Sequence, residues 1–223
     1  MEYGRDFSHW RTSAGAQWSA FTQHDFVRGL GDGTLPREAF MRYLVQDYIF
    51  LIHFARAWAL AVTKADTVEE MRLAAGTVDA LINGEIALHI KTCAEAGLSE
   101  HDLFAAPEHP HNIAYTRYVL DAGHSGDFLD LLAALAPCVM GYGEIGLTLK
   151  EQAGSDVYGD WIATYSGEDY QSSCIAVGQL IDGAITRRLG DDPTRSPRWE
   201  ALTQRFITAT RLEVGFWDMG LSG

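Results

Sequence analysis

Cysteine, proline and basic residues are all scarce in this sequence of 223 residues. It has 3 cysteines and 6 prolines, and its 17 Lys and Arg against 30 Asp and Glu leave a formal net charge of −13. An odd, widely spaced set of cysteines does not fit a disulfide framework or a cysteine-based zinc site. The acidic excess disfavours nucleic acid and anionic membranes as partners, because both bind basic patches.

Long apolar runs are lacking as well. The opening MEYGRDFSHW contains acidic residues and no apolar stretch, so it does not resemble a signal peptide. The longest uncharged run around Cys138, residues 131–143, is too short to span a bilayer. We therefore expect a soluble, cytoplasmic protein with reduced cysteines and no membrane partner.

The apolar residues that are present recur with helical spacing almost throughout, and we find no alternating strand, internal repeat or low-complexity linker. This pattern predicts one all-α domain spanning residues 1–223. Pro36 marks one helix start, and Asp66 with Glu69 resembles a capping box at another. About eight helices are expected, over residues 5–21, 36–65, 66–97, 111–122, 127–154, 156–167, 168–190 and 196–220.

Four of these helices place polar groups on stripes that should face the core. One such group means little, but four predict a polar pocket inside a helical bundle, because a buried carboxylate needs a partner. Pro137 also removes a backbone donor just before Cys138. The stripes are Phe40, Leu44, Asp47, Leu51, Phe54 and Trp58; Met71, Ala75, Val78, Ile82, Glu85 and His89; Leu131, Leu135, Cys138, Tyr142, Ile145 and Leu149; and Phe206, Thr210, Glu213 and Trp217.

Each of these groups also has a purely structural interpretation. Cys138 alone is more often small core filler than a nucleophile. Asp47 and Glu213 could pair with buried arginines, for which Arg42 and Arg211 are near in sequence. Glu85 with His89 could form an i, i+4 hydrogen bond, and Tyr115, Tyr142 and Tyr165 could be ordinary core aromatics.

A thiol with carboxylates and phenols, without a Cys/His/Asn set, does not fit a protease. It suits covalent attack of the thiolate on an electron-poor ring, while a carboxylic acid kept protonated by its apolar surroundings donates a proton. Burial raises a carboxyl pKa, as a general acid near neutral pH requires.

Five segments carry a resemblance to one known family, in order along the chain: HDFVRGLGDGTLPREAFMRYLVQDYIFLIHFA, GEIALH, LLAALAPCVMGYGEIG, YGDWIATYSGEDY and LEVGFWDMG. Together they cover roughly residues 10–220. They resemble the TenA family (thiaminase II), whose members have the haem-oxygenase-like helical fold. GDGTLP, QD, PC and the WI-TY run are specific in combination, and the cysteine resembles that of the cysteine-bearing branch.

The resemblance implies a role for each matching position. Cys138 matches the catalytic cysteine that adds to the pyrimidine ring at C2, and Glu213 matches the proton donor. Asp47 matches the aspartate at the amino edge of the ring, and Tyr142 and Tyr165 match substrate-contacting tyrosines. Tyr115 matches a further tyrosine that lines the pocket, and Phe50 stands at another pocket position. Glu85 and His89 are expected, from their place on the stripe, to be structural or to line the pocket.

The activity implied is hydrolysis of 4-amino-5-aminomethyl-2-methylpyrimidine to the hydroxymethyl pyrimidine and ammonia, and of thiamine to the same pyrimidine plus the thiazole. The resemblance implies no metal and no organic cofactor, and a homotetramer. Phe50 stands where relatives carry a pocket tyrosine, and Val139, Met140 and Gly141 replace bulky aromatics, so the preferred substrate stays open.

Two other classes of function are left open by the sequence. A di-iron oxidase of the same fold could use Glu85, His89, Asp47, His53 and Glu213, although the usual Glu-x-x-His on two helices is absent. A non-catalytic pyrimidine-binding or regulatory protein would keep Asp47 and the tyrosines and tolerate loss of Cys138.

Overall fold

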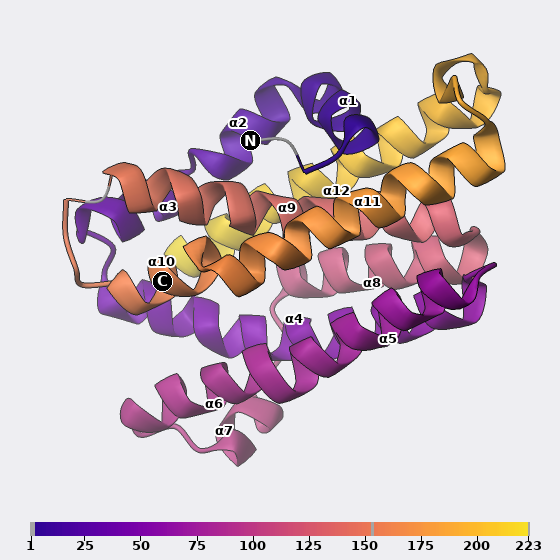
Figure 1. Ribbon diagram of the computed structural model, residues 1–223. Coiled ribbons are helices and arrows are strands. Elements are labelled where there is room, and N and C mark those ends of the chain that lie inside the picture. Colours follow the sequence, from indigo (N-terminus) through magenta and orange to yellow (C-terminus); the bar gives the residue numbers. More distant parts are fainter. Residues whose placement is uncertain (1–2, 153, 223) are drawn as a thin grey trace.

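The computed structural model describes residues 3–152 and 154–222 and is built from helices throughout these ranges (Figure 1). Long helices run roughly alongside one another, and short helices join them at the ends. The elements are α1 (Arg5–Ala14), α2 (Ala16–Thr22), α3 (Asp25–Asp32), α4 (Arg37–Lys64), α5 (Val68–Ala80), η1 (Leu81–Glu85), α6 (Ile86–Glu95), α7 (Glu100–Ala105), α8 (Pro110–Ser125), α9 (Phe128–Gln152), α10 (Gly159–Ser166), α11 (Glu168–Leu189), η2 (Pro193–Arg195) and α12 (Pro197–Leu221).

The all-α prediction is confirmed, but the described residues form twelve α-helices where about eight were expected. Gly15, at a φ of 47°, splits the expected 5–21 helix into α1 and α2, because a positive φ interrupts an α-helix. The short helices α3 and α7 lie in segments expected to be connections. The capping residue of α5 is Thr67 rather than Asp66, and its hydroxyl accepts from the Glu70 N–H.

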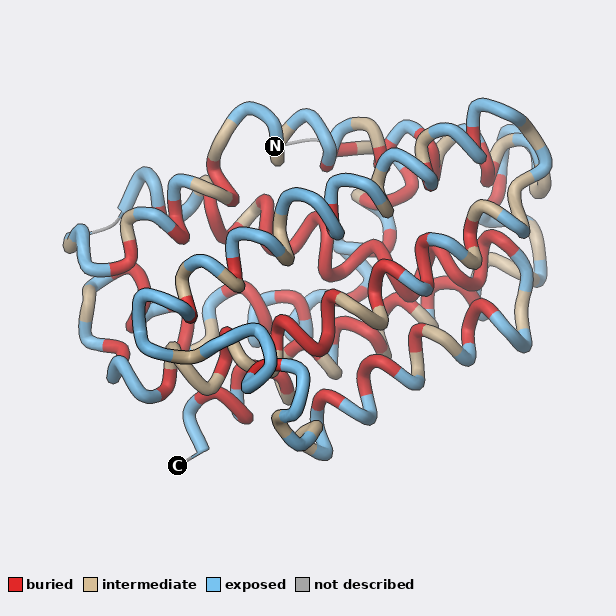
Figure 2. Tube along the Cα trace, turned by 90° about the horizontal axis from the view of Figure 1, so that it is seen from below, coloured by how far each residue is buried: buried red, intermediate tan, exposed pale blue. Residues whose placement is uncertain are grey.

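Helix α9 is the centre of the packing, since α2, α3, α4, α8, α10, α11 and α12 all contact it. Residues 128–143 of this helix are buried without interruption. In length and composition α9 could cross a membrane, but 94% of its apolar window is buried inside the protein, which identifies it as a core helix. Elsewhere in the chain buried and exposed stretches alternate along each helix, as amphipathic packing requires (Figure 2).

Three of the four predicted stripes are confirmed by burial, with only Phe40 half-buried among them. The stripe along α5 and α6 is partly wrong, because Met71 and Ile82 are exposed. The stripe fails because of η1, a single π turn that adds a residue and so changes the helical register between α5 and α6. Leu81 and Glu85, at the two ends of this turn, share the face that points inward with His89, four residues further on.

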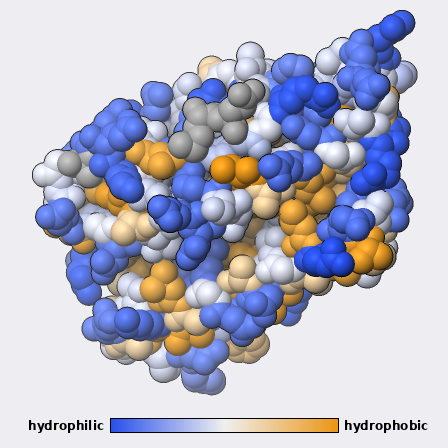
Figure 3. Space-filling model, viewed as in Figure 1, coloured by the Kyte–Doolittle hydropathy of each residue, from blue (hydrophilic) through white to orange (hydrophobic). Residues whose placement is uncertain are grey.

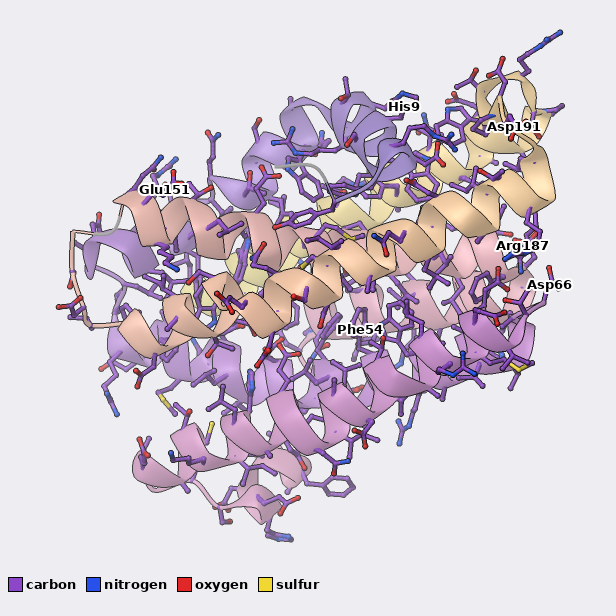
Figure 4. The ribbon with its side chains drawn as sticks, in the orientation of Figure 1. His9, Phe54, Asp66, Glu151, Arg187 and Asp191 are labelled. Carbon is purple, nitrogen blue, oxygen red and sulfur yellow. The ribbon has the colours of Figure 1, made fainter. Side chains whose placement is uncertain are left out.

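Helices α5 and α11 lie side by side and are joined at one end by a group of ion pairs. Arg188 donates to both carboxylate oxygens of the buried Glu70 at 2.8 and 3.0 Å, and it also pairs with Asp66 at 2.7 Å. Figure 4 shows Asp66 and Arg187 close together at this end. Burial raises the pKa of Glu70, but the arginine and the Asp66 N–H outweigh it and lower that pKa to about 2.

Replacement of Glu70 by Gln should lower the free energy of unfolding by about 2 kcal/mol at pH 7, because Arg188 loses its charged partner. A carboxyl with a lowered folded pKa stabilises the protein above its unfolded value of 4.5, and the effect is lost as the pH falls towards about 2. The difference between the two proteins in urea unfolding should therefore shrink from pH 5 to pH 3. Glu69→Gln, on the exposed side of the same turn, is the control; an equal loss in that variant would contradict the assignment.

Candidate active site

A cavity of about 950 Å³ lies between α4, the α5–η1–α6 segment, α9, α10 and α11. Four residues of the predicted set are in its wall: Asp47, Glu85, Cys138 and Tyr142. On the face viewed in Figure 3 the surface is hollowed between the segments that Figure 1 labels α11 and α5. A volume of this size is at the upper end of the range for small-molecule sites, about 300–1,000 Å³.

Asp47 on α4 is held by two other side chains. Its Oδ2 accepts from the Tyr43 hydroxyl at 3.1 Å and lies 2.7 Å from Nε2 of His89 on α6. The other ring nitrogen of His89, Nδ1, lies 2.9 Å from the Glu85 carbonyl oxygen. Burial lowers the pKa of His89, but the hydrogen bond and charge of Asp47, with Glu85, outweigh it and raise that pKa. The ring therefore donates at both nitrogens, and Asp47 Oδ1 has no partner among the described residues.

Glu85, the last residue of the π turn, connects the α5–α6 segment to α10. The Tyr165 hydroxyl donates to its Oε1 at 2.7 Å. Burial, followed by the negative charge of Asp47, raises the pKa of Glu85. Gly146 on α9 makes room for Tyr165, because a Cβ at this position would lie 2.5 Å from the tyrosine's backbone carbon.

Cys138 on α9 lines the cavity and is 9% exposed. Burial raises the pKa of its thiol well above the ordinary value, and the negative charges of Glu213 and Glu85 raise it further. The thiol is therefore protonated at neutral pH. Tyr142, one turn further along α9, packs on Tyr165 with ring centroids 5.0 Å apart.

Glu213 on α12 lies behind the cavity wall and is 1% exposed. The Tyr115 hydroxyl donates to its Oε1 at 2.6 Å. Burial raises the pKa of Glu213 to about 8, although the hydrogen bond from Tyr115 opposes the rise. The rings of Phe50 and Tyr115 pack with their centroids 5.0 Å apart. Phe50 therefore lies next to the phenol that hydrogen-bonds to Glu213.

Of the nine predicted site residues, four line the cavity. Tyr165 and His89 reach it through Glu85 and Asp47, and Tyr115, Phe50 and Glu213 form a second layer. The proposed arginine partners are wrong, because Arg42 donates to the Gly220 carbonyl and Arg211 is exposed. Glu85 and His89 do form an i, i+4 hydrogen bond, although it uses the backbone carbonyl of Glu85.

Sequence reasoning did not single out Tyr43 or Trp161, which complete the support of Asp47. The Trp161 indole N–H donates to the Tyr43 hydroxyl at 3.3 Å. Tyr43 precedes Asp47 by one helical turn on the same face, and this spacing is the signal that could have found it. Tyr170, which donates to the Val139 carbonyl at 3.3 Å, also lines the cavity.

Within residues 3–152 and 154–222, no group of three or more His, Cys, Asp or Glu side chains is arranged to hold a metal ion. His53, a candidate iron ligand by sequence, instead lies 2.9 Å from Glu108. The donor set of a di-iron centre is therefore not assembled by these described residues.

The fold and the cavity define an all-α protein with an inter-helical cavity, open at the surface, that contains a thiol. The fold is haem-oxygenase-like: a crystal structure from Shewanella denitrificans, described as a domain of unknown function with that fold, has a TM-score of 0.73 at 12% identity, covering 96% of this chain and 91% of that one.

The chain belongs to the TENA/THI-4/PQQC family, whose model matches residues 12–223. An aminopyrimidine aminohydrolase of Halalkalibacterium halodurans is 34% identical over 205 residues, 91% of this chain and 89% of that protein. A crystal structure from Silicibacter sp., described as a TenA family transcription regulator, has a TM-score of 0.98 at 61% identity and covers 99% of this chain and 98% of that one.

Replacement of Glu213 by Gln should raise the free energy of unfolding by about 2 kcal/mol at pH 7, because the carboxyl must take up a proton to fold. With a folded pKa of about 8 and an unfolded value of 4.5, this cost is absent below pH 4.5 and complete above pH 8. Urea unfolding at pH 4, 6 and 8 measures it. Glu200→Gln, exposed on the same helix, is the control; a gain for Glu213→Gln that is equal at pH 4 and pH 8 would contradict the shift.

Proposed function

We propose that this protein hydrolyses 4-amino-5-aminomethyl-2-methylpyrimidine to the hydroxymethyl pyrimidine and ammonia, with thiamine as a second substrate. The observation that carries the proposal is the cavity that joins the Cys138 thiol to the Asp47 carboxylate. Membership of a family that includes aminopyrimidine aminohydrolases supports it. A cytoplasmic homotetramer is part of the same proposal.

Asp47 is suited to bind the amino edge of the ring. Its Oδ2 takes the hydrogen bonds of Tyr43 and His89, so Oδ1 is the oxygen available to accept an amino N–H of the substrate. His89 hydrogen-bonds to Oδ2 of the same carboxylate, and a hydrogen bond to a carboxylate is stronger than one to a neutral acceptor. Tyr142 in the cavity wall then packs against the ring.

The resting protonation state sets the order of the chemistry. Because Cys138 holds its proton, sulfur forms a bond to C2 as that proton passes to a ring nitrogen. Electrons of the resulting enamine expel the amine from the methylene carbon, and the amine leaves with the proton of Glu213, which is protonated at neutral pH. Water then adds at the methylene and returns a proton to Glu213, and the thiol is expelled from the ring.

A non-catalytic regulatory role is the second candidate, because the similar Silicibacter structure is described as a transcription regulator. Direct binding to nucleic acid fits poorly with a net charge of −13. A regulator would bind the pyrimidine without releasing ammonia, so one assay separates the two functions.

The test is ammonia release from the aminomethyl pyrimidine, and thiazole release from thiamine, by the wild type and by Cys138→Ala. We expect Cys138→Ala to reduce kcat by at least about 1,000-fold, because covalent catalysis is removed. The pyrimidine should still raise its Tm, because Asp47 remains.

Cys93→Ala is the matched control, since Cys93 is a fully buried cysteine on α6 outside the cavity wall. It should keep wild-type turnover. Turnover by Cys138→Ala at the wild-type rate would sink the assignment of the nucleophile. A folded wild type that binds the pyrimidine without turnover would favour the regulatory role.

A further inference from the structure

The side-chain amide of Gln171, near the start of α11, joins three other parts of the chain. Its Nε2 donates to the Gly143 carbonyl of α9 at 3.0 Å and to the Tyr165 carbonyl of α10 at 2.7 Å. Its Oε1 accepts from the Tyr3 hydroxyl at 2.8 Å. Because both amide donors and the amide oxygen are in use, the plane of this amide is fixed as well as its position.

The Tyr165 carbonyl needs a partner from outside its own helix. Tyr165 is the last but one residue of α10 (Gly159–Ser166), and carbonyl groups in the last turn of a helix have no partner within that helix. Gln171 supplies the partner from the next helix, across the corner at Gly167. On α9, a Cβ at Gly146 would lie 2.5 Å from the Tyr165 backbone carbon. The backbone of Tyr165 is therefore held by contacts with two helices, α9 and α11.

Tyr3 is itself packed against α11, beside which α1 lies (Figure 1). Its side chain is 2% exposed and reaches α9, where a Cβ at Gly143 would be 2.8 Å from its hydroxyl oxygen. Its carbonyl oxygen is so close to Gly178 of α11 that a Cβ there would overlap it. One turn further along α11, Asp182 accepts the first two N–H groups of α1, both at 2.9 Å. The position of Tyr3 is therefore set by this packing and not by the bond to Gln171 alone.

Tyr165 connects this group of contacts to the cavity. Its hydroxyl donates to Glu85 Oε1 at 2.7 Å, and Glu85 is in the cavity wall. A tyrosine side chain has only two rotatable bonds, so a shift of its backbone also moves its hydroxyl. Gln171 and Tyr3 are both outside the cavity wall, so neither contacts a ligand bound there. Any effect of the two on the site must pass through Tyr165.

From these contacts we propose that Gln171 is a positioning residue that holds the Tyr165 hydroxyl against Glu85. Tyr3 supports Gln171 in turn, so the segment Tyr3–Asp6 belongs to the support of the site. The inference rests on the proposed function for its kinetic consequence, and it adds residues that contact neither the ligand cavity nor the reacting groups.

The test is a double-mutant cycle between Gln171→Leu and Tyr165→Phe, measured as kcat/KM for the aminomethyl pyrimidine. Leucine is close to glutamine in size and removes all three hydrogen bonds of the amide. We expect Gln171→Leu to lower kcat/KM about tenfold in the wild type, because a displaced hydroxyl loses its hydrogen-bond geometry. In the Tyr165→Phe background the same change should lower kcat/KM about twofold or less, since the hydroxyl to be positioned is absent.

Tyr3→Phe is the second variant, because it removes one hydroxyl and keeps the packing of the ring. It should lower kcat/KM about threefold, again only where Tyr165 keeps its hydroxyl, and it decides the question if Gln171→Leu does not fold. Tyr118→Phe is the matched control. Tyr118 is a half-buried tyrosine of α8 outside the cavity wall, and its hydroxyl donates to the Arg205 carbonyl at 3.3 Å. This variant should keep the wild-type kcat/KM.

Failure of this inference is distinguishable from failure of the proposed function. An unchanged kcat/KM in Gln171→Leu, or an equal loss in both backgrounds, would overturn the inference and leave the function intact, because residues that do not act on one another give additive effects. If the wild type turns over no pyrimidine, the function fails and hydrogen exchange decides on the positioning. Amides of residues 163–170 should then exchange about tenfold faster in Gln171→Leu and remain as in the wild type in Tyr118→Phe. Unchanged exchange of these amides in Gln171→Leu would overturn the inference.

Discussion

The buried contact between Asp47 and His89, at 2.7 Å, is the interaction on which the rest of the site depends. It joins α4 to α6, two of the helices that form the cavity wall. Because both His89 nitrogens face acceptor oxygens, the ring is an imidazolium, and the charge compensates a carboxylate that would otherwise be costly to bury. The same contact keeps Oδ2 of Asp47 in hydrogen bonds within the protein and leaves Oδ1 for a ligand.

Around this pair, burial raises the pKa of the other ionisable groups of the site. Desolvation raises the pKa of Glu213 and Glu85, and nearby negative charge raises both further. With a pKa of about 8, Glu213 carries its proton at neutral pH. In the proposed reaction, a single environment thus provides a hydrogen-bond acceptor for the ring and a proton donor for the leaving group.

The sequence predicts the core-facing positions of the site where the helical register is regular. The stripes of α4, α9 and α12 could be read directly, so Asp47, Cys138 and Glu213 were placed on the core face. The stripe before Glu85 could not, because a π turn changes the periodicity and no residue type in LINGE announces it. Partners across helices, such as Tyr115 for Glu213, depend on tertiary packing, which spacing along one helix does not report.

The neutral resting state of Cys138 makes its reactivity depend on the substrate. A thiol with a raised pKa is a poor nucleophile towards adventitious electrophiles and oxidants, because the thiolate is the reactive form. A bound pyrimidine changes this by bringing a ring nitrogen that can take the thiol proton as sulfur attacks the adjacent carbon. In the proposed reaction, burial of Cys138 near carboxyl groups therefore restricts the chemistry to a ring that binds Asp47 and presents its own base.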